Sequence, residues 1–81
     1  MTGFVYVLKM NNGKCYIGST KDLQRRISEH MRGNVYSTKN NRPLELIFYK
    51  KFENIGIAHK KELWLKNQKS RKIIELFISD S

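Results

Sequence analysis

The chain has 81 residues, and its 16 Lys and Arg against seven Asp and Glu give a net charge of +9. A chain of this length forms one small domain with a modest core, so we predict a single domain over residues 1–81. Its only cysteine, Cys15, excludes an internal disulfide and favours a reducing compartment. The sequence has no apolar run long enough to span a bilayer, and its start lacks the features of a signal peptide. We therefore expect a cytoplasmic location.

Positive charge is spread along the whole chain rather than gathered in a tail. Residues 1–40 hold seven basic and two acidic residues, and residues 41–81 hold nine and five. A basic folded surface attracts polyanions, so nucleic acid is the predicted partner. The alternative is an excess of lysine that only keeps a small protein soluble. A membrane-surface role is disfavoured because no predicted helix pairs a basic face with a full apolar face.

The first predicted elements are two strands, residues 3–10 and 14–19, that form a β-hairpin. The first strand is apolar on both faces, which indicates a central position in the sheet. The turn contains Asn12-Gly13, and its length decides the pairing. A two-residue turn would place Tyr6 and Tyr16 on opposite faces. A three-residue loop that ends at Gly13 with positive φ would pair Tyr6 with Gly18 and place both tyrosines on one face.

A helical period begins after the hairpin, and we predict a helix from Lys21 to Arg32. Leu23, Ile27 and Met31 recur every four residues along it. Thr20 is the expected N-cap, and Gly33 is a stop signal. Residues 33–42 are polar and predict a loop.

The remaining elements are a strand and two helices. Residues 44–52 are rich in strand formers, and residues 57–67 predict a second helix with Asn54 as its cap. Ser70 is expected to cap a short third helix. The predicted fold class is therefore α+β, with a three-stranded, mostly antiparallel sheet flanked by three helices. The aromatic residues predicted to enter the core are Phe48, Phe52 and Trp64.

Several residues could carry chemistry on this frame. Tyr6 and Tyr16 could cooperate, although aromatic residues in paired strands more often pack in the core. Arg26 and His30 are four residues apart and share a helix face. Arg26 suits a phosphate oxygen or a surface ion pair, and His30 suits a proton relay, a phosphate contact or a partly exposed polar position.

Glu62 stands in the apolar stripe of the second helix, in line with Ala58 and Leu65. Burial of a carboxylate requires a compensating cation. That cation could be Lys66, one turn further along the helix, or a divalent metal such as Mg²⁺, which often takes only one or two carboxylates. A zinc site is unsupported, because there is no cysteine pair and His59 is isolated in the sequence.

Together these residues resemble the GIY-YIG nuclease family, in particular its small single-domain members. The second signature is present as Tyr16-Ile17-Gly18, whereas the first is degenerate and retains only Tyr6. Arg26, His30 and Glu62 follow in the family's order, and the similarity spans nearly the whole chain. Ser19 stands where some family enzymes carry a lysine.

The resemblance implies hydrolysis of phosphodiester bonds with one bound Mg²⁺ or Mn²⁺ held by Glu62. Tyr16 or Tyr6 would help to deprotonate the attacking water. Arg26 would stabilise charge on phosphorus, and His30 would relay a proton or contact phosphate. These five are the predicted catalytic residues.

We also predict substrate contacts, at Gly18, Ser19, Arg25 and Thr38. The predicted substrate is DNA or RNA, with DNA favoured. The chain lacks an evident targeting segment, so it would recognise nucleic-acid structure or depend on a protein partner for specificity. Two alternatives stay open: a nucleic-acid-binding module that does not cut, and a protein-interaction domain whose basic charge is incidental.

Overall fold

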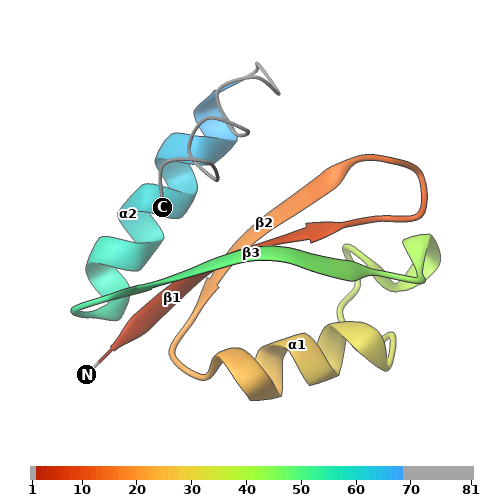
Figure 1. The fold of residues 1–81 in the computed structure, drawn as a ribbon, viewed down its shortest axis with the longest axis horizontal. Helices are drawn as coiled ribbons and strands as arrows, with labels where there is room; N and C mark the ends of the chain where they lie inside the picture. Colours follow the sequence, from red (N-terminus) through yellow and green to blue (C-terminus); the bar gives the residue numbers. More distant parts are fainter. Residues whose placement is uncertain (1, 69–81) are drawn as a thin grey trace.

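A computed structural model describes residues 2–68 as a three-stranded sheet with a helix on each face (Figure 1). The strands are β1 (Gly3–Lys9), β2 (Cys15–Thr20) and β3 (Glu45–Phe52); the helices are α1 (Leu23–Met31) and α2 (Ile55–Asn67), with a 3₁₀ turn at Lys39–Asn41. The predicted third helix lies outside the described residues. Within residues 2–68, no helix combines the length and the apolar character that a membrane crossing requires.

The sheet has the order β2-β1-β3, and both neighbouring pairs are antiparallel. The predicted central position of β1 is confirmed. Val5, Val7 and Leu8 have no exposed surface, because helices cover both faces of this strand. The predicted α+β fold class is likewise confirmed, and the sheet is fully antiparallel rather than mostly so.

The β1–β2 hairpin closes through the three-residue loop that ends at Gly13. Met10 N–H donates to Lys14 O over 2.8 Å, and Gly13 has a φ of 84°. Tyr6 pairs with Gly18 and Leu8 pairs with Tyr16, so the two tyrosines share one face. The two-residue turn, which would have separated them, is excluded.

Each face of the sheet has its own core. Tyr6, Leu8 and Leu44 are buried on the face that α1 covers, with Leu23 and Ile27 of α1 packed against them. On the opposite face, buried residues of β1 and β2 pack against α2; they are Val5, Val7, Ile17, Ala58 and Leu65. Trp64, which was predicted to enter the core, is 46% exposed because it lies off the buried stripe of α2.

The helix ends differ in detail from the predictions. The N-cap of α1 is Asp22, whose carboxylate accepts a hydrogen bond from Arg25 N–H, and not the predicted Thr20. The Thr20 hydroxyl instead hydrogen-bonds the backbone of Asp22, so the helix begins at Leu23. Gly33 follows α1 with a φ of 82°, as a stop signal requires. The predicted cap Asn54 is confirmed, since its side chain accepts from Ile57 N–H.

Gly18 sets the space for the Tyr6 ring, and this generates a prediction about stability. A Cβ atom at Gly18 would overlap the hydroxyl end of the Tyr6 side chain, which is buried. We expect Gly18→Ala to lower the free energy of unfolding by about 1–3 kcal/mol, measured by urea denaturation. Gly56→Ala is the control, because that position is exposed in α2 and a Cβ there would come no closer than 3.2 Å to Asn54 Oδ1, whereas alanine favours a helix. An equal loss in both variants would contradict this explanation.

Candidate functional site

Tyr6, Tyr16 and His30 form an aromatic cluster between the sheet and α1. The Tyr6 and Tyr16 ring centroids are 6.3 Å apart, and the His30 ring lies 5.5 Å from Tyr6 and 5.1 Å from Tyr16. The tyrosines meet because the hairpin register places them on one face, and His30 reaches them from the last turn of α1. The structure thus brings together three of the five predicted catalytic residues.

A buried chain of hydrogen bonds runs through His30. The Tyr6 hydroxyl is 2.9 Å from His30 Nε2, and the Thr38 hydroxyl is 2.8 Å from His30 Nδ1. His30 and Thr38 have no exposed surface, and Tyr6 is 1% exposed. Either tautomer of a neutral imidazole satisfies both bonds, since a hydroxyl both donates and accepts. Both ring nitrogens of His30 are therefore occupied within the interior.

Burial keeps this chain electrically neutral. Desolvation, reinforced by the positive charge of Arg26, lowers the pKa of His30 to about 4. Burial also raises the pKa of Tyr6 to about 12, despite the opposing effect of the Arg26 guanidinium. At neutral pH His30 is thus uncharged and Tyr6 retains its proton.

These positions correct several expectations for individual residues. Thr38 was expected to contact substrate, but its side chain is fully buried and hydrogen-bonds His30. A direct phosphate contact by His30 is excluded for the same reason, whereas a relay through Tyr6 stays a prediction. Gly18 is also buried, and its role in the structure is to leave space for the Tyr6 ring.

Arg26 and Tyr16 form the accessible side of the site. The Arg26 guanidinium is 3.2 Å from Glu29 Oε1, and this side chain is 38% exposed. Interaction with the Tyr6 phenol raises the pKa of Arg26. Tyr16 is half-buried and is the more accessible of the two tyrosines. Arg25, one residue before Arg26, is exposed, and its contact with a substrate stays a prediction.

Glu62 approaches from α2, and three side chains surround its carboxylate. Ser19 Oγ donates to Oε1, His59 Nδ1 lies 3.5 Å from Oε1, and Lys66 Nζ lies 2.5 Å from Oε2. Glu62 is 7% exposed. Desolvation raises its pKa, but the hydrogen bonds from Lys66 and Ser19 and the nearby positive charge outweigh this and leave the pKa lowered. The carboxylate is therefore ionised at neutral pH.

Lys66 links Glu62 to the aromatic cluster. Its ammonium contacts the Glu62 carboxylate and lies 5.9 Å from the centroid of the Tyr16 ring. The sequence predicts Lys66 only as a partner for Glu62, and it predicts no partner for His59. His59 is three residues before Glu62 on the same helix, so helical spacing could have identified it.

The residues around Glu62 fit a divalent cation that keeps most of its waters. Within residues 2–68 no three His, Cys, Asp or Glu side chains gather in a way that could hold a metal. One carboxylate with hydroxyl and water ligands suits Mg²⁺ or Mn²⁺, which do not need a full protein cage. The Lys66 ammonium, 44% exposed on a flexible side chain, would have to withdraw from Oε2.

The lowered pKa of His30 predicts a pH-dependent stability. Between pH 6.5 and about pH 4 an unfolded chain binds a proton at this histidine that the folded chain excludes. The free energy of unfolding should therefore fall as pH drops through this window, by up to about 3 kcal/mol from this residue. Urea denaturation at several pH values measures the fall. An NMR titration of the His30 ring is the control, and a midpoint near 6.5 would contradict the prediction.

Comparisons with known proteins match most of the chain. A family model described as the GIY-YIG catalytic domain matches residues 2–74. The chain is 34% identical over 74 residues to UPF0213 proteins of Staphylococcus aureus, a match that covers 90% of each chain. It also resembles the solution NMR structure of a UPF0213 protein from Bacillus halodurans. The TM-score is 0.64 at 31% identity, and the match covers 98% of this chain and 84% of the other. The chain therefore belongs to the GIY-YIG family, and its relatives include the UPF0213 proteins.

Proposed function

We propose that this protein is a metal-dependent endonuclease that hydrolyses phosphodiester bonds in DNA or RNA. The observation that carries the proposal is the convergence of two elements that the sequence places far apart. Lys66 Nζ touches Glu62 Oε2 and faces the Tyr16 ring, so the acid of α2 borders the aromatic cluster of the hairpin and α1. Under this proposal a carboxylate, a phenol and a guanidinium would act together on one phosphate, as phosphodiester hydrolysis requires.

Tyr16 is the proposed general base. It is the more accessible tyrosine, whereas Tyr6 is buried with a pKa of about 12 and is hydrogen-bonded to His30. A phenolate, favoured by a nearby cation such as the bound metal or the Arg26 guanidinium, can accept a proton from the water that attacks the scissile phosphate. Tyr6 and His30 would orient the Tyr16 ring through their ring contacts with it. Thr38 would hold the His30 ring in place from its other nitrogen.

Arg26 and Glu62 would act on the phosphate. Arg26 would leave Glu29, with which it forms a half-exposed ion pair, and bind a non-bridging oxygen in the transition state. A divalent cation held by Glu62 would polarise the phosphate and stabilise charge on the leaving oxygen. Ser19 would orient the Glu62 carboxylate through its hydrogen bond.

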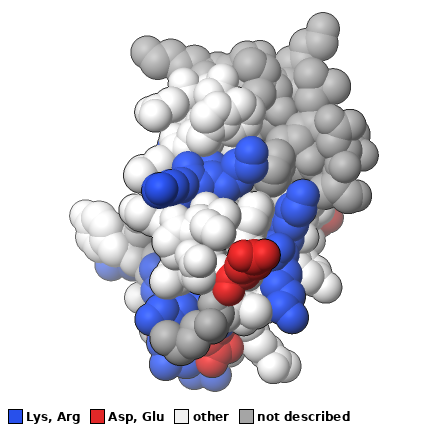
Figure 2. Space-filling view, turned by 90° about the vertical axis from the view of Figure 1, so that its left-hand side faces the viewer, with Lys and Arg blue, Asp and Glu red and all other residues white. Residues whose placement is uncertain are grey.

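The substrate proposal draws on charge. Figure 2 shows a face on which lysine and arginine side chains outnumber acidic ones, in keeping with the net charge of +9. Such a surface favours the nucleic-acid backbone without reading its sequence. We also propose that residues 1–81 form a single domain, that the protein is cytoplasmic, and that a protein partner supplies specificity.

A binding module that does not cut is the second candidate. One observation favours it: the Glu62 carboxylate already has a cation, because Lys66 occupies Oε2 at 2.5 Å. Under this alternative the acid serves only to anchor α2, and the basic surface does the binding.

Cleavage assays separate the two candidates. The panel is labelled duplex, nicked, flapped and single-stranded DNA and RNA, each with Mn²⁺, Mg²⁺ or EDTA. We expect metal-dependent cleavage that Glu62→Gln abolishes, because the amide cannot neutralise a bound cation. Tyr16→Phe should slow cleavage by roughly 100- to 10,000-fold, the usual contribution of a general base.

Matched variants serve as controls for this assay. Glu53→Gln and Tyr36→Phe change an exposed acid and an exposed tyrosine outside the site and should cut like the wild type. Salt-sensitive binding without cleavage, unchanged in Glu62→Gln, would contradict the nuclease and establish the binding module.

The contact between Lys66 and Glu62 predicts the strength of metal binding. Lys66→Met keeps much of the side-chain volume but removes the ammonium that competes for Oε2. We expect it to bind Mn²⁺ on the order of tenfold more tightly, since one opposing charge is lost from the site. Electron paramagnetic resonance of Mn²⁺ measures the affinity without turnover, and Lys60→Met, an exposed neighbour on α2, is the control. Unchanged binding in Lys66→Met would place the metal elsewhere.

A further inference from the structure

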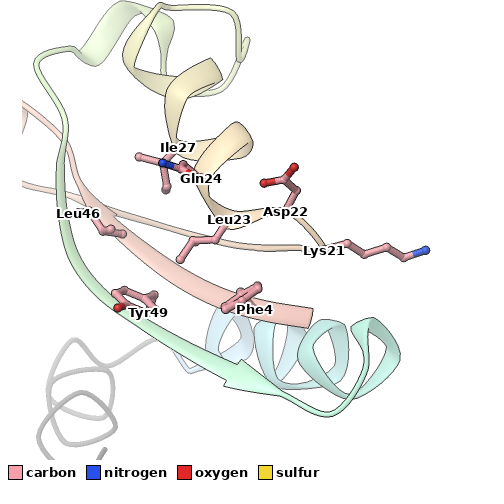
Figure 3. Close-up of a pocket in the computed structure, with 8 residues that line it drawn as sticks. All are labelled: Phe4, Lys21, Asp22, Leu23, Gln24, Ile27, Leu46 and Tyr49. Atoms are coloured by element: carbon pink, nitrogen blue, oxygen red, sulfur yellow. The ribbon is translucent and has the colours of Figure 1, made fainter. Parts of the chain in front are cut away.

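An apolar groove opens beside α1, on the face of the sheet that carries Tyr6. Its volume is about 690 Å³, within the range of sites that bind small organic groups. Its lining residues are Phe4, Lys21, Asp22, Leu23, Gln24, Ile27, Leu46 and Tyr49. Figure 3 shows the side chains of Phe4, Leu23, Leu46 and Tyr49 around one space between α1 and the strands β1 and β3. None of the residues given a role in cleavage lines this groove.

The groove is nevertheless next to the candidate active site. Tyr49 of β3 is the register partner of Tyr6, and Phe4 is two residues before Tyr6, so both lie on its face of the sheet. The Tyr6 ring extends toward β2, because it fills the space above Gly18. The groove thus occupies the β3 side of this face, while the aromatic cluster occupies the β2 side. A bound chain could reach both.

The lining combines aromatic surface with a basic rim. Tyr49 is 57% exposed, which is a large exposed fraction for a tyrosine in a sheet. Lys21 borders the groove from the bend between β2 and α1. Exposed Lys51 is the register partner of Phe4, so it lies on the same face of the sheet. Among residues 2–68, Asp22 is the only acid that lines the groove, and its carboxylate caps α1. An apolar floor with lysine residues nearby matches a nucleobase and the phosphates next to it.

We propose that this groove binds an unpaired base of the nucleic acid, stacked against the ring of Tyr49. The inference rests on the proposed function and specifies its substrate class: single-stranded or locally unpaired nucleic acid, with a base held beside the scissile phosphate. Lys21 and Lys51 contact the phosphates on either side of that base. Stacking tolerates any sequence because every base has a flat apolar face.

Binding of a fluorescent oligonucleotide tests the proposal. The probe is a short single-stranded DNA with an adenine analogue whose emission is quenched when it stacks, and all measurements are made in EDTA. We expect wild type to quench the analogue, and Tyr49→Ala to lose the quenching and to bind about tenfold more weakly. Tyr49→Phe should retain both, because it keeps the ring. Tyr36→Ala is the matched control, since Tyr36 is 84% exposed and lies outside the groove.

A change in the probe gives a second, independent arm. The second probe is a single-stranded DNA in which one nucleotide lacks its base. Wild type should bind this probe more weakly than the intact strand. Tyr49→Ala should bind the two strands equally. Because this comparison changes the DNA and not the protein, a change in protein folding cannot explain its result. Equal binding of both strands by wild type, or equal losses in Tyr49→Ala and Tyr36→Ala, would overturn the groove as a base site.

Failure of the groove is distinguishable from failure of the nuclease. If wild type quenches the probe in EDTA but does not cut with Mn²⁺, the groove stands and the proposed cleavage is lost. The opposite outcome is that wild type cuts DNA with Mn²⁺ and that Tyr49→Ala has the same ratio of single-strand to duplex cleavage as wild type. In that case the groove is overturned and the nuclease stands.

Discussion

The contact between the Tyr6 ring and Gly18 governs the rest of the site. The three-residue loop places these residues opposite each other, and the missing side chain of Gly18 lets the Tyr6 hydroxyl reach His30. His30 is then held from its other side by Thr38. A shift of the hairpin register by one residue would turn Tyr6 toward α2 and would break this chain of bonds. One turn therefore determines both a core contact and the geometry of the candidate active site.

The second constraint is the charge on Glu62. A carboxylate that is 7% exposed in a small core requires partners, and it draws them from two elements, Ser19 of β2 and Lys66 of α2. The same contacts that make its burial tolerable occupy the oxygens that a divalent cation would use. Stability of the resting protein and the proposed metal binding would thus compete for one carboxylate.

Helix α1 separates two surfaces with different chemistry. On its β2 side lie the polar groups that suit a phosphate, and on its β3 side lies a groove with aromatic walls. Arg26 and Ile27 are neighbours in the helix and project toward these different environments. A nucleic acid likewise has a charged backbone and flat apolar bases, so the two surfaces together suit the proposed substrate.

The sequence by itself determined the α+β class, the central position of β1, the caps at Asn54 and Gly33, and the family resemblance carried by Tyr6, Tyr16, Arg26, His30 and Glu62. These follow from local patterns, because hydrophobic period, turn residues and spacing act over a few positions. Only the tertiary structure decided the burial of His30 and Thr38, the contact of Ser19 with Glu62 and the groove beside Tyr49. Each joins residues from different elements, so it depends on how the helices pack against the sheet. Spacing along one element carries no information about that packing.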